Sequence, residues 1–190
     1  DLGGSLYLDA GHRAGRPAVP AVDFAAVRAE LAGVLSLVRA GLVTAAHDVS
    51  DGGLAVALAE MAVGLEGQAR RGARLAIPAG LGDLSLREAL FGEHGGFVVT
   101  CPADRGAEVE KLLSFAGAAW WPLGEVTDGA TLEVRGARGE QVAVAVDDLA
   151  RAWQSGLPRL FGGEAAVTAL PQAAPAASPP NRRGRPDCQA

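Results

Sequence analysis

The sequence has few of the residues that build disulfides or metal clusters, and it has no long apolar run. Only Cys101 and Cys188 are cysteines among 190 residues. Two cysteines do not make a disulfide framework, and no Cys/His pattern has the spacing of a metal site. The most apolar run, residues 54–65, contains Glu60 and is far shorter than the roughly 20 residues of a membrane span. With no signal peptide recognisable either, we expect a cytoplasmic protein that has no membrane partner.

Lysine and methionine are also scarce. Lys111 is the only lysine among the 17 basic residues, and 22 acidic residues bring the net charge to −5. Because there is no basic stripe, we expect no nucleic-acid partner. Met61 is the only methionine and the chain begins at Asp1, so we expect a fragment or a processed product.

Apolar residues make up 49% of the chain, which is enough for one globular domain with a sizeable core. From Gly162 onward the composition changes to Ala, Pro, Ser and Gly, followed by Arg182, Arg183 and Arg185. Such a segment buries too little apolar surface to offset its ordering entropy. The sequence therefore predicts one domain over residues 1–161 and a disordered tail over residues 162–190.

Helical and strand patterns alternate along residues 1–161. After a loop over residues 10–22, apolar spacing predicts helices over residues 24–38, 53–66, 84–90 and 104–116, and a last helix that Asp147 caps and residues 156–158 stop. Strands are expected at residues 41–46, 73–77, 97–101, 120–126, 132–134 and 141–146, the last two paired as a hairpin. The predicted class is α/β, bordering on α+β, with helices packed on a mixed sheet.

The chain is organised around residues 47–54, His-Asp-Val-Ser-Asp-Gly-Gly-Leu, which join a strand to a helix. Ser50 and Asp51 are good N-cap residues, and Gly52 and Gly53 permit a ligand to approach the backbone closely. The positive end of a helix suits an anion such as phosphate. The alternative is a capped helix that follows a Gly-Gly turn and meets no ligand.

Three further side chains are candidates for ligand contact, each with a structural alternative. His47 is either a ligand contact or a hydrogen-bonded structural histidine, since no nucleophile lies beside it in the sequence. Asp48 and Asp51 are either magnesium ligands or turn and cap residues. Glu93, in the glycine-rich turn Phe-Gly-Glu-His-Gly-Gly, either orients a ligand or accepts from backbone N–H groups.

The helix after the Gly-Gly turn is apolar all round: Leu54, Leu58, Met61 and Leu65 share one face, and Val56 and Val63 lie on nearly the opposite side. Such a helix is buried between two layers or packs against another domain.

Residues 46–62, Ala-His-Asp-Val-Ser-Asp-Gly-Gly-Leu-Ala-Val-Ala-Leu-Ala-Glu-Met-Ala, closely resemble the C-terminal region of phosphoribosylformylglycinamidine synthases, enzymes of purine biosynthesis. The lead-in Leu-Gly-Gly-Ser-Leu-Tyr-Leu at residues 2–8 and Leu-Phe-Gly-Glu at residues 90–93 agree with this resemblance. So do Pro-Leu-Gly-Glu-Val at residues 122–126, Ala-Trp at 152–153 and Leu-Pro-Arg-Leu-Phe at 157–161. The resemblance covers about residues 1–161.

The resemblance implies the C-terminal α/β domain of an aminoimidazole-ribonucleotide-synthetase-like unit. The implied enzyme is an ATP-dependent ligase that converts formylglycinamide ribonucleotide and ammonia to the amidine, with magnesium. A glutaminase domain or subunit would supply the ammonia. Preceding domains of the same enzyme would bind most of the ATP and magnesium, so no catalytic residue or metal ligand is assigned here, and the isolated fragment is expected to be inactive.

Two departures from the family pattern stand out. No arginine follows Glu93 before the next strand. In the family, the first copy of this turn resembles the substrate contact, so the second copy, found here, is expected to form an auxiliary or vestigial site. The proline-rich tail runs past the usual end near Phe161. Two other hypotheses remain open: a domain of a related thiamine-phosphate kinase or hydrogenase maturation factor, and a non-catalytic packing module of the larger enzyme.

Overall fold

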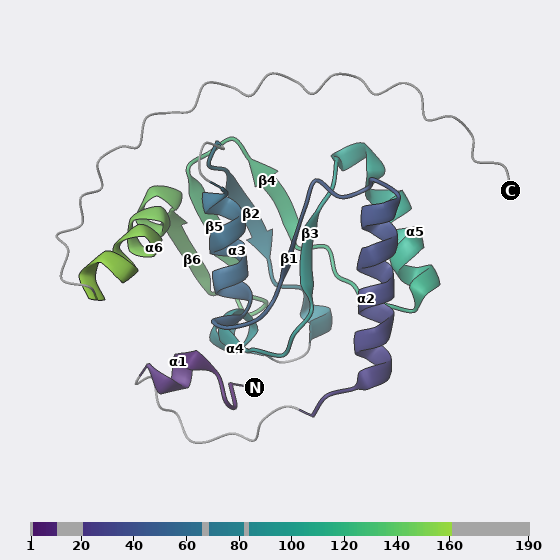
Figure 1. Cartoon of the computed structure of the whole chain (residues 1–190), viewed down its shortest axis with the longest axis horizontal. Helices are drawn as coiled ribbons and strands as arrows, with labels where there is room; N and C mark the ends of the chain where they lie inside the picture. The colour runs from purple at the N-terminus through teal and green to yellow at the C-terminus, as the bar shows by residue number, and fades with distance from the viewer. Residues whose placement is uncertain (1, 11–20, 66–68, 82–83, 161–190) are drawn as a thin grey trace, which may run out of the picture.

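The computed structural model describes residues 2–10, 21–65, 69–81 and 84–160 (Figure 1). The predicted tail over residues 162–190 and most of the expected loop over residues 10–22 lie outside these ranges. The helices are α1 (Leu6–Asp9), α2 (Phe24–Arg39), α3 (Gly53–Val63), α4 (Leu86–Phe91), α5 (Gly106–Ala116) and α6 (Val146–Leu160). The strands are β1 (Ala45–Asp48), β2 (Gly72–Ala76), β3 (Phe97–Thr100), β4 (Gly124–Thr127), β5 (Thr131–Arg135) and β6 (Gln141–Ala145).

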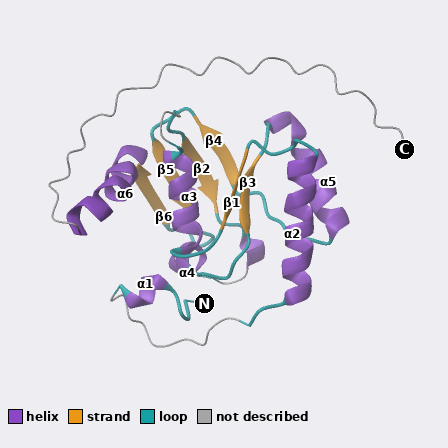
Figure 2. Cartoon of the chain, in the orientation of Figure 1, coloured by secondary structure: helices purple, strands orange, loops and turns teal. Residues whose placement is uncertain are grey.

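The strands form two open sheets; α3, α4 and α6 lie beside the larger sheet, and α2 and α5 lie beside the smaller one (Figure 2). One sheet has four strands in the order β4-β2-β5-β6, in which β2 and β5 are parallel and the other neighbours antiparallel. The other is the antiparallel pair β1–β3. The mixed architecture confirms the predicted fold class. The predicted hairpin is also confirmed, since Leu132 lies opposite Val144 and Val134 opposite Val142.

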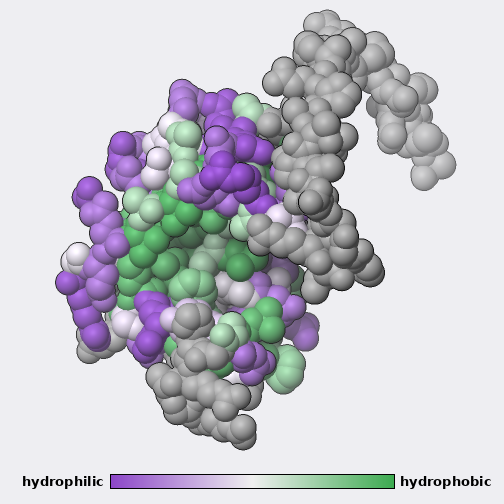
Figure 3. Space-filling model, turned by 90° about the vertical axis from the view of Figure 1, so that its left-hand side faces the viewer, coloured by the Kyte–Doolittle hydropathy of each residue, from purple (hydrophilic) through white to green (hydrophobic). Residues whose placement is uncertain are grey.

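The larger core lies between α3 and the strands. Ala57 and Leu58 of α3 pack with Leu75 of β2 and with Leu132 and Val134 of β5. The other face of this sheet is polar, because side chains alternate along a strand. The predicted packing of this helix on the sheet is therefore confirmed. Figure 3 shows that the side of the molecule where α3 and α6 lie carries a broad apolar area bordered by polar side chains.

A second core lies between α2, α5 and the β1–β3 pair. Leu37 of α2 is fully buried and packs with Val109 and Leu113 of α5. The helix begins where the sequence predicts, because the Asp23 carboxylate accepts from the backbone N–H groups of Ala25 and Ala26 at 2.9 and 3.1 Å. The second core therefore holds β1 from the side opposite to α3.

Several predicted boundaries differ from the structure. The strand expected at residues 41–46 is β1, Ala45–Asp48, because its pairing with β3 begins at Ala45 opposite Thr100. The strand expected from Trp120 begins only at Gly124, where pairing with β2 starts. Helix α6 starts at Val146, one residue before the expected cap, and continues to Leu160 past Pro158. Among the described residues, no helix is both long and apolar enough to cross a bilayer.

The two sides of α2 lead to a direct test. We expect Leu37→Ala to lower the free energy of unfolding by about 2–5 kcal/mol, because it leaves a cavity between α2 and α5. Leu35→Ala on the same helix is the control, since Leu35 is 47% exposed and its replacement removes little packing. Urea unfolding of both variants provides the measurement, and equal losses would contradict this packing.

Candidate functional site

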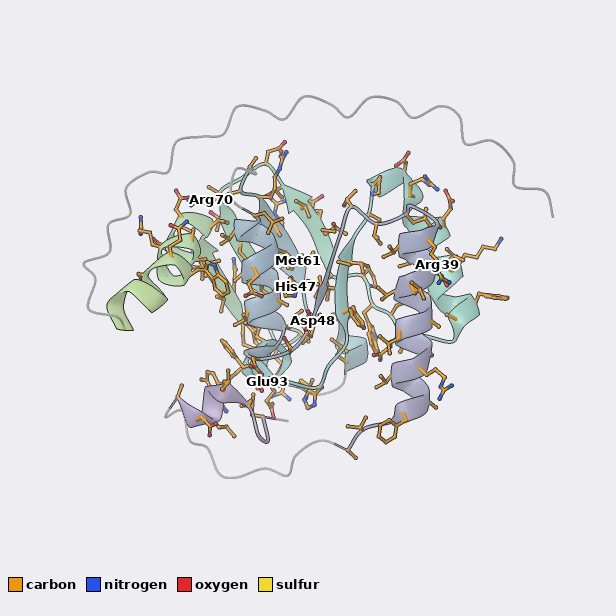
Figure 4. The ribbon with its side chains drawn as sticks, viewed as in Figure 1. Arg39, His47, Asp48, Met61, Arg70 and Glu93 are labelled. Atoms are coloured by element: carbon orange, nitrogen blue, oxygen red, sulfur yellow. The ribbon has the colours of Figure 1, made fainter. Side chains whose placement is uncertain are left out.

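The candidate loop follows directly from the end of β1. His47 and Asp48 are the last residues of the strand, paired with Val98 and Phe97 of β3, so they are not part of a free turn. The ladder continues one step further, where the Val49 N–H donates to the Gly96 carbonyl at 2.9 Å. Only residues 49–52 then connect the strand to α3. Strand pairing thus fixes where the candidate side chains emerge from the sheet (Figure 4).

The expected cap by Ser50 or Asp51 is wrong. The N-cap of α3 is Gly52, which is left-handed with φ +80° and makes no side-chain cap hydrogen bond. The Gly53 N–H donates instead to the Ser50 backbone carbonyl at 2.9 Å. Since a backbone oxygen takes this donor, the side chains of Ser50 and Asp51 are not needed as caps, and both residues are exposed.

Glu93 supplies the acceptor for the other glycine. Its Oε1 accepts from the Gly52 N–H at 2.8 Å and from the Leu6 N–H at 2.9 Å. One carboxylate oxygen therefore joins the lead-in helix α1, the loop and the turn after α4, which are far apart in the sequence. It also places a negative charge at the positive end of α3. In this structure the Gly52 and Gly53 amides thus have acceptors inside the protein.

Gly53 is also required by packing. It has φ +67°, and a Cβ at this position would lie 2.8 Å from the Leu90 carbonyl oxygen and 2.9 Å from that of Gly92. The start of α3 therefore presses against the backbone that ends α4. This contact explains the second glycine of the motif without a ligand.

Both ring nitrogens of His47 lie close to oxygen atoms. Its Nε2 lies 3.0 Å from Glu60 Oε2, and its Nδ1 lies 2.7 Å from the Asp48 carbonyl oxygen. The ring thereby links β1 to α3. Glu60 is a partner that was not predicted from the sequence, although a single carboxylate in an otherwise apolar helix is a signal that could have identified it.

A capping box holds α4, and α4 leads to Glu93. The Ser85 hydroxyl and backbone N–H donate to Glu88 Oε2 at 2.7 and 3.0 Å, and these hydrogen bonds lower the pKa of Glu88. After Glu93, the ring of His94 lies over Gly92, and partial desolvation lowers the pKa of His94.

The remaining candidate side chains face solvent. The Asp48 side chain is 63% exposed, and Ser50 and Asp51 are exposed as well. Over residues 2–10, 21–65, 69–81 and 84–160, no three His, Cys, Asp or Glu side chains are grouped so that they could hold a metal ion. Asp48 and Asp51 therefore do not make a magnesium site on their own.

Two surface cavities lie away from this loop. Both include Arg74 of β2, and they extend over parts of β4 and β5. Arg74 pairs there with Glu125 at 2.8 Å. Neither cavity is lined by a residue of the 47–54 segment.

Comparison with known proteins identifies the fold. The sequence model of the family described as AIR synthase related protein, C-terminal domain, matches residues 2–137. The chain belongs to this family. The match includes the 47–54 loop, Glu93 and every described strand up to β5, so the predicted resemblance to a synthetase-like C-terminal domain is confirmed.

Two curated relatives of this chain are PurL subunits. The phosphoribosylformylglycinamidine synthase subunit PurL of Anaeromyxobacter dehalogenans strain 2CP-1 is 41% identical over 176 residues, covering 87% of this chain and 22% of that protein. The same subunit from Parasynechococcus marenigrum is 40% identical over 175 residues, covering 86% of this chain and 21% of that protein. The chain therefore spans about a fifth of the length of these relatives.

Solved structures give the same fold. Thermotoga maritima PurL complexed with ATP matches with a TM-score of 0.58 and 23% identity, covering 70% of this chain and 23% of that one. The structure of PurLQS from the same organism matches with a TM-score of 0.56 and 21% identity, covering 74% and 24%.

Two substitutions of Glu93 test its hydrogen bond to the Gly52 N–H. Glu93→Ala should lower the free energy of unfolding by about 1–3 kcal/mol, because the partly buried Gly52 N–H loses its acceptor. Glu93→Gln keeps an acceptor oxygen and should cost less. Hydrogen exchange of the Gly52 amide and urea unfolding measure both effects, with Glu110→Ala on the exposed side of α5 as the control. An unchanged exchange rate in Glu93→Ala would contradict this role.

Gly53 and Gly95 form a matched pair of glycines. Both have positive φ, +67° and +82°, but nothing lies within 4 Å of a Cβ built at Gly95. Gly95→Ala should therefore cost only the left-handed conformation, about 1–2 kcal/mol. Gly53→Ala adds a clash with the end of α4 and should cost about 2–5 kcal/mol in total. If urea unfolding gave the same loss of unfolding free energy for both variants, the proposed clash at Gly53 would be contradicted.

Proposed function

We propose that this chain acts as the C-terminal domain of an ATP-dependent phosphoribosylformylglycinamidine synthase. The reaction converts formylglycinamide ribonucleotide, ATP and ammonia to formylglycinamidine ribonucleotide, and a glutaminase domain or subunit supplies the ammonia from glutamine. The observation that carries the proposal is the 41% identity to a PurL subunit over 87% of the chain. The curated relatives named above are PurL subunits, which favours this function over the kinase and maturation-factor alternatives.

The part played by this chain is to complete a site that other domains build. The Gly52 and Gly53 amides are occupied internally, and no metal-binding group is present among the described side chains. What the chain offers is the exposed end of β1, where Asp48, Ser50 and Asp51 face outward. In this proposal the remaining domains bind ATP and magnesium, and these three side chains contact the ligand or its metal from one side.

A non-catalytic packing module is the second candidate. It is favoured by Glu93, which ties the loop to α1 inside the protein, as a structural element requires. The two candidates differ in one respect, namely whether the end of β1 meets a ligand. Replacing the carboxylate of Asp48 separates them, because the contact recorded for this group among the described residues is a distant one, with His47 Nδ1 at 3.7 Å.

The test uses a chimera in which this chain replaces the matching segment of the Anaeromyxobacter dehalogenans PurL subunit. We expect the chimera to form the amidine with ATP and ammonia, and the free chain to show no turnover. Asp48→Asn should lower the kcat/KM of the chimera by about tenfold or more. Asp104→Asn, in an exposed turn before α5, is the control. An unchanged kcat/KM in Asp48→Asn would favour the packing module, and an inactive chimera would contradict the proposed function.

A further inference from the structure

One face of α2 is apolar and has no partner within the described part of the chain. Five side chains along this face have exposed fractions of 80, 39, 52, 47 and 52%. We call them the α2 stripe: Phe24, Val27, Leu31, Leu35 and Val38. Gly33 and Leu37, on the opposite side of the helix, are the buried residues that pack against α5. The intramolecular contacts of α2 therefore use its other face.

The stripe has the geometry of a helix-packing seam. Its spacings of three, four, four and three residues keep the side chains in one line along the helix. The line extends over about 21 Å at the usual rise of an α-helix. Single exposed apolar residues are common on proteins, but an aligned and contiguous set marks an interaction surface.

Unpaired charges border the stripe on both edges. At 100° per residue, Arg28 and Arg39 follow one edge and Glu30 lies on the other. None of these three has an ion-pair partner among the described residues, although Arg105 and Arg151 pair within their own helical segments. An apolar seam with charged edges fits another helix that carries the opposite charges in register. The complementary partner thus presents carboxylates along the arginine edge.

The first residues of the stripe lie towards the end of the molecule at which β1 also ends. Helix α2 turns through residues 40–44 straight into β1, so the start of α2 and the end of β1 lie towards the same end of the molecule (Figure 1). Figure 4 shows Glu93 towards that end, Asp48 near the middle of the molecule and Arg39 nearer the opposite end.

We propose that the α2 stripe is the docking surface for a helix of another domain of the same synthase. This inference rests on the proposed function, since PurL relatives carry almost four fifths of their length outside the part that this chain matches. The docked helix presents an apolar seam with carboxylates facing Arg28 and Arg39. It fixes α2, and through α2 the strand that carries the candidate site.

The test measures thiol reactivity at the stripe in the free chain and in the PurL chimera. Leu31→Cys is placed in a background in which Cys101→Ala and Cys188→Ser remove the natural thiols. Phe115→Cys on α5, where Phe115 is 90% exposed, is the control. We expect the Leu31→Cys thiol to react about tenfold or more slowly in the chimera than in the free chain, as for a residue in the core of an interface. The control thiol should react at the same rate in both.

Each other outcome overturns the proposal. Equal reactivity of Leu31→Cys in both proteins means that no domain covers the stripe, and a chimera that is active but unprotected refutes the docking while leaving the proposed function intact. Reactivity in the free chain that falls as protein concentration rises assigns the stripe to a second copy of the chain. Equal protection of the Phe115→Cys thiol moves the contact away from α2.

Discussion

The arrangement of the candidate site depends on one carboxylate oxygen. Glu93 Oε1 accepts the Gly52 N–H at the start of α3 and the Leu6 N–H at the start of α1. Helix starts have donors that must be satisfied, and a carboxylate satisfies them more strongly than a neutral acceptor. Because this acceptor belongs to the protein, the loop keeps its form without a bound phosphate. The end of β1 is thereby held in place, with the Asp48 side chain exposed.

Around that contact, packing leaves little freedom to the backbone. Gly53 is pressed against the carbonyl oxygens at the end of α4, and His47 bridges from β1 to Glu60 of α3. The rigid part therefore consists of the strand end, the turn and the helix start. The side chains of Asp48, Ser50 and Asp51 remain outside it and face solvent. This division between a fixed backbone and outward polar groups suits a domain that completes a site made elsewhere.

The apolar surfaces point to the same kind of role. The α2 stripe and the apolar area beside α3 and α6 remain exposed on a domain that matches about a fifth of its PurL relatives. Exposed apolar surface in a domain of a larger protein is commonly an interface between domains. The sheet face that carries Arg74, Glu125 and Glu133 is polar by contrast, with its charges paired across neighbouring strands. The domain therefore has faces of two kinds, one solvated and one suited to partners.

The sequence by itself determined the elements whose causes are local. The Asp23 cap starts α2, and the Ser85–Glu88 box could be recognised from its spacing. Alternation over residues 141–146 predicted the pairing with residues 132–134, and the structure added its register. The 46–62 motif was enough to identify the family. These features depend on side chains that lie close together in the sequence, so both partners of each contact can be recognised from the sequence.

Only the tertiary structure decided how the candidate loop is satisfied and which faces stay open. The acceptor for Gly52 is 41 residues away, and the backbone that excludes a Cβ at Gly53 belongs to α4. Local chemistry favoured Ser50 or Asp51 as the cap, but those side chains were not used because distant and backbone oxygens had taken the donors. Likewise, the spacing of α2 predicted an apolar face, and only its packing on α5 through Gly33 and Leu37 showed that the larger apolar side chains point outward. Contacts between segments far apart in the chain depend on how the elements pack, which local propensity does not encode.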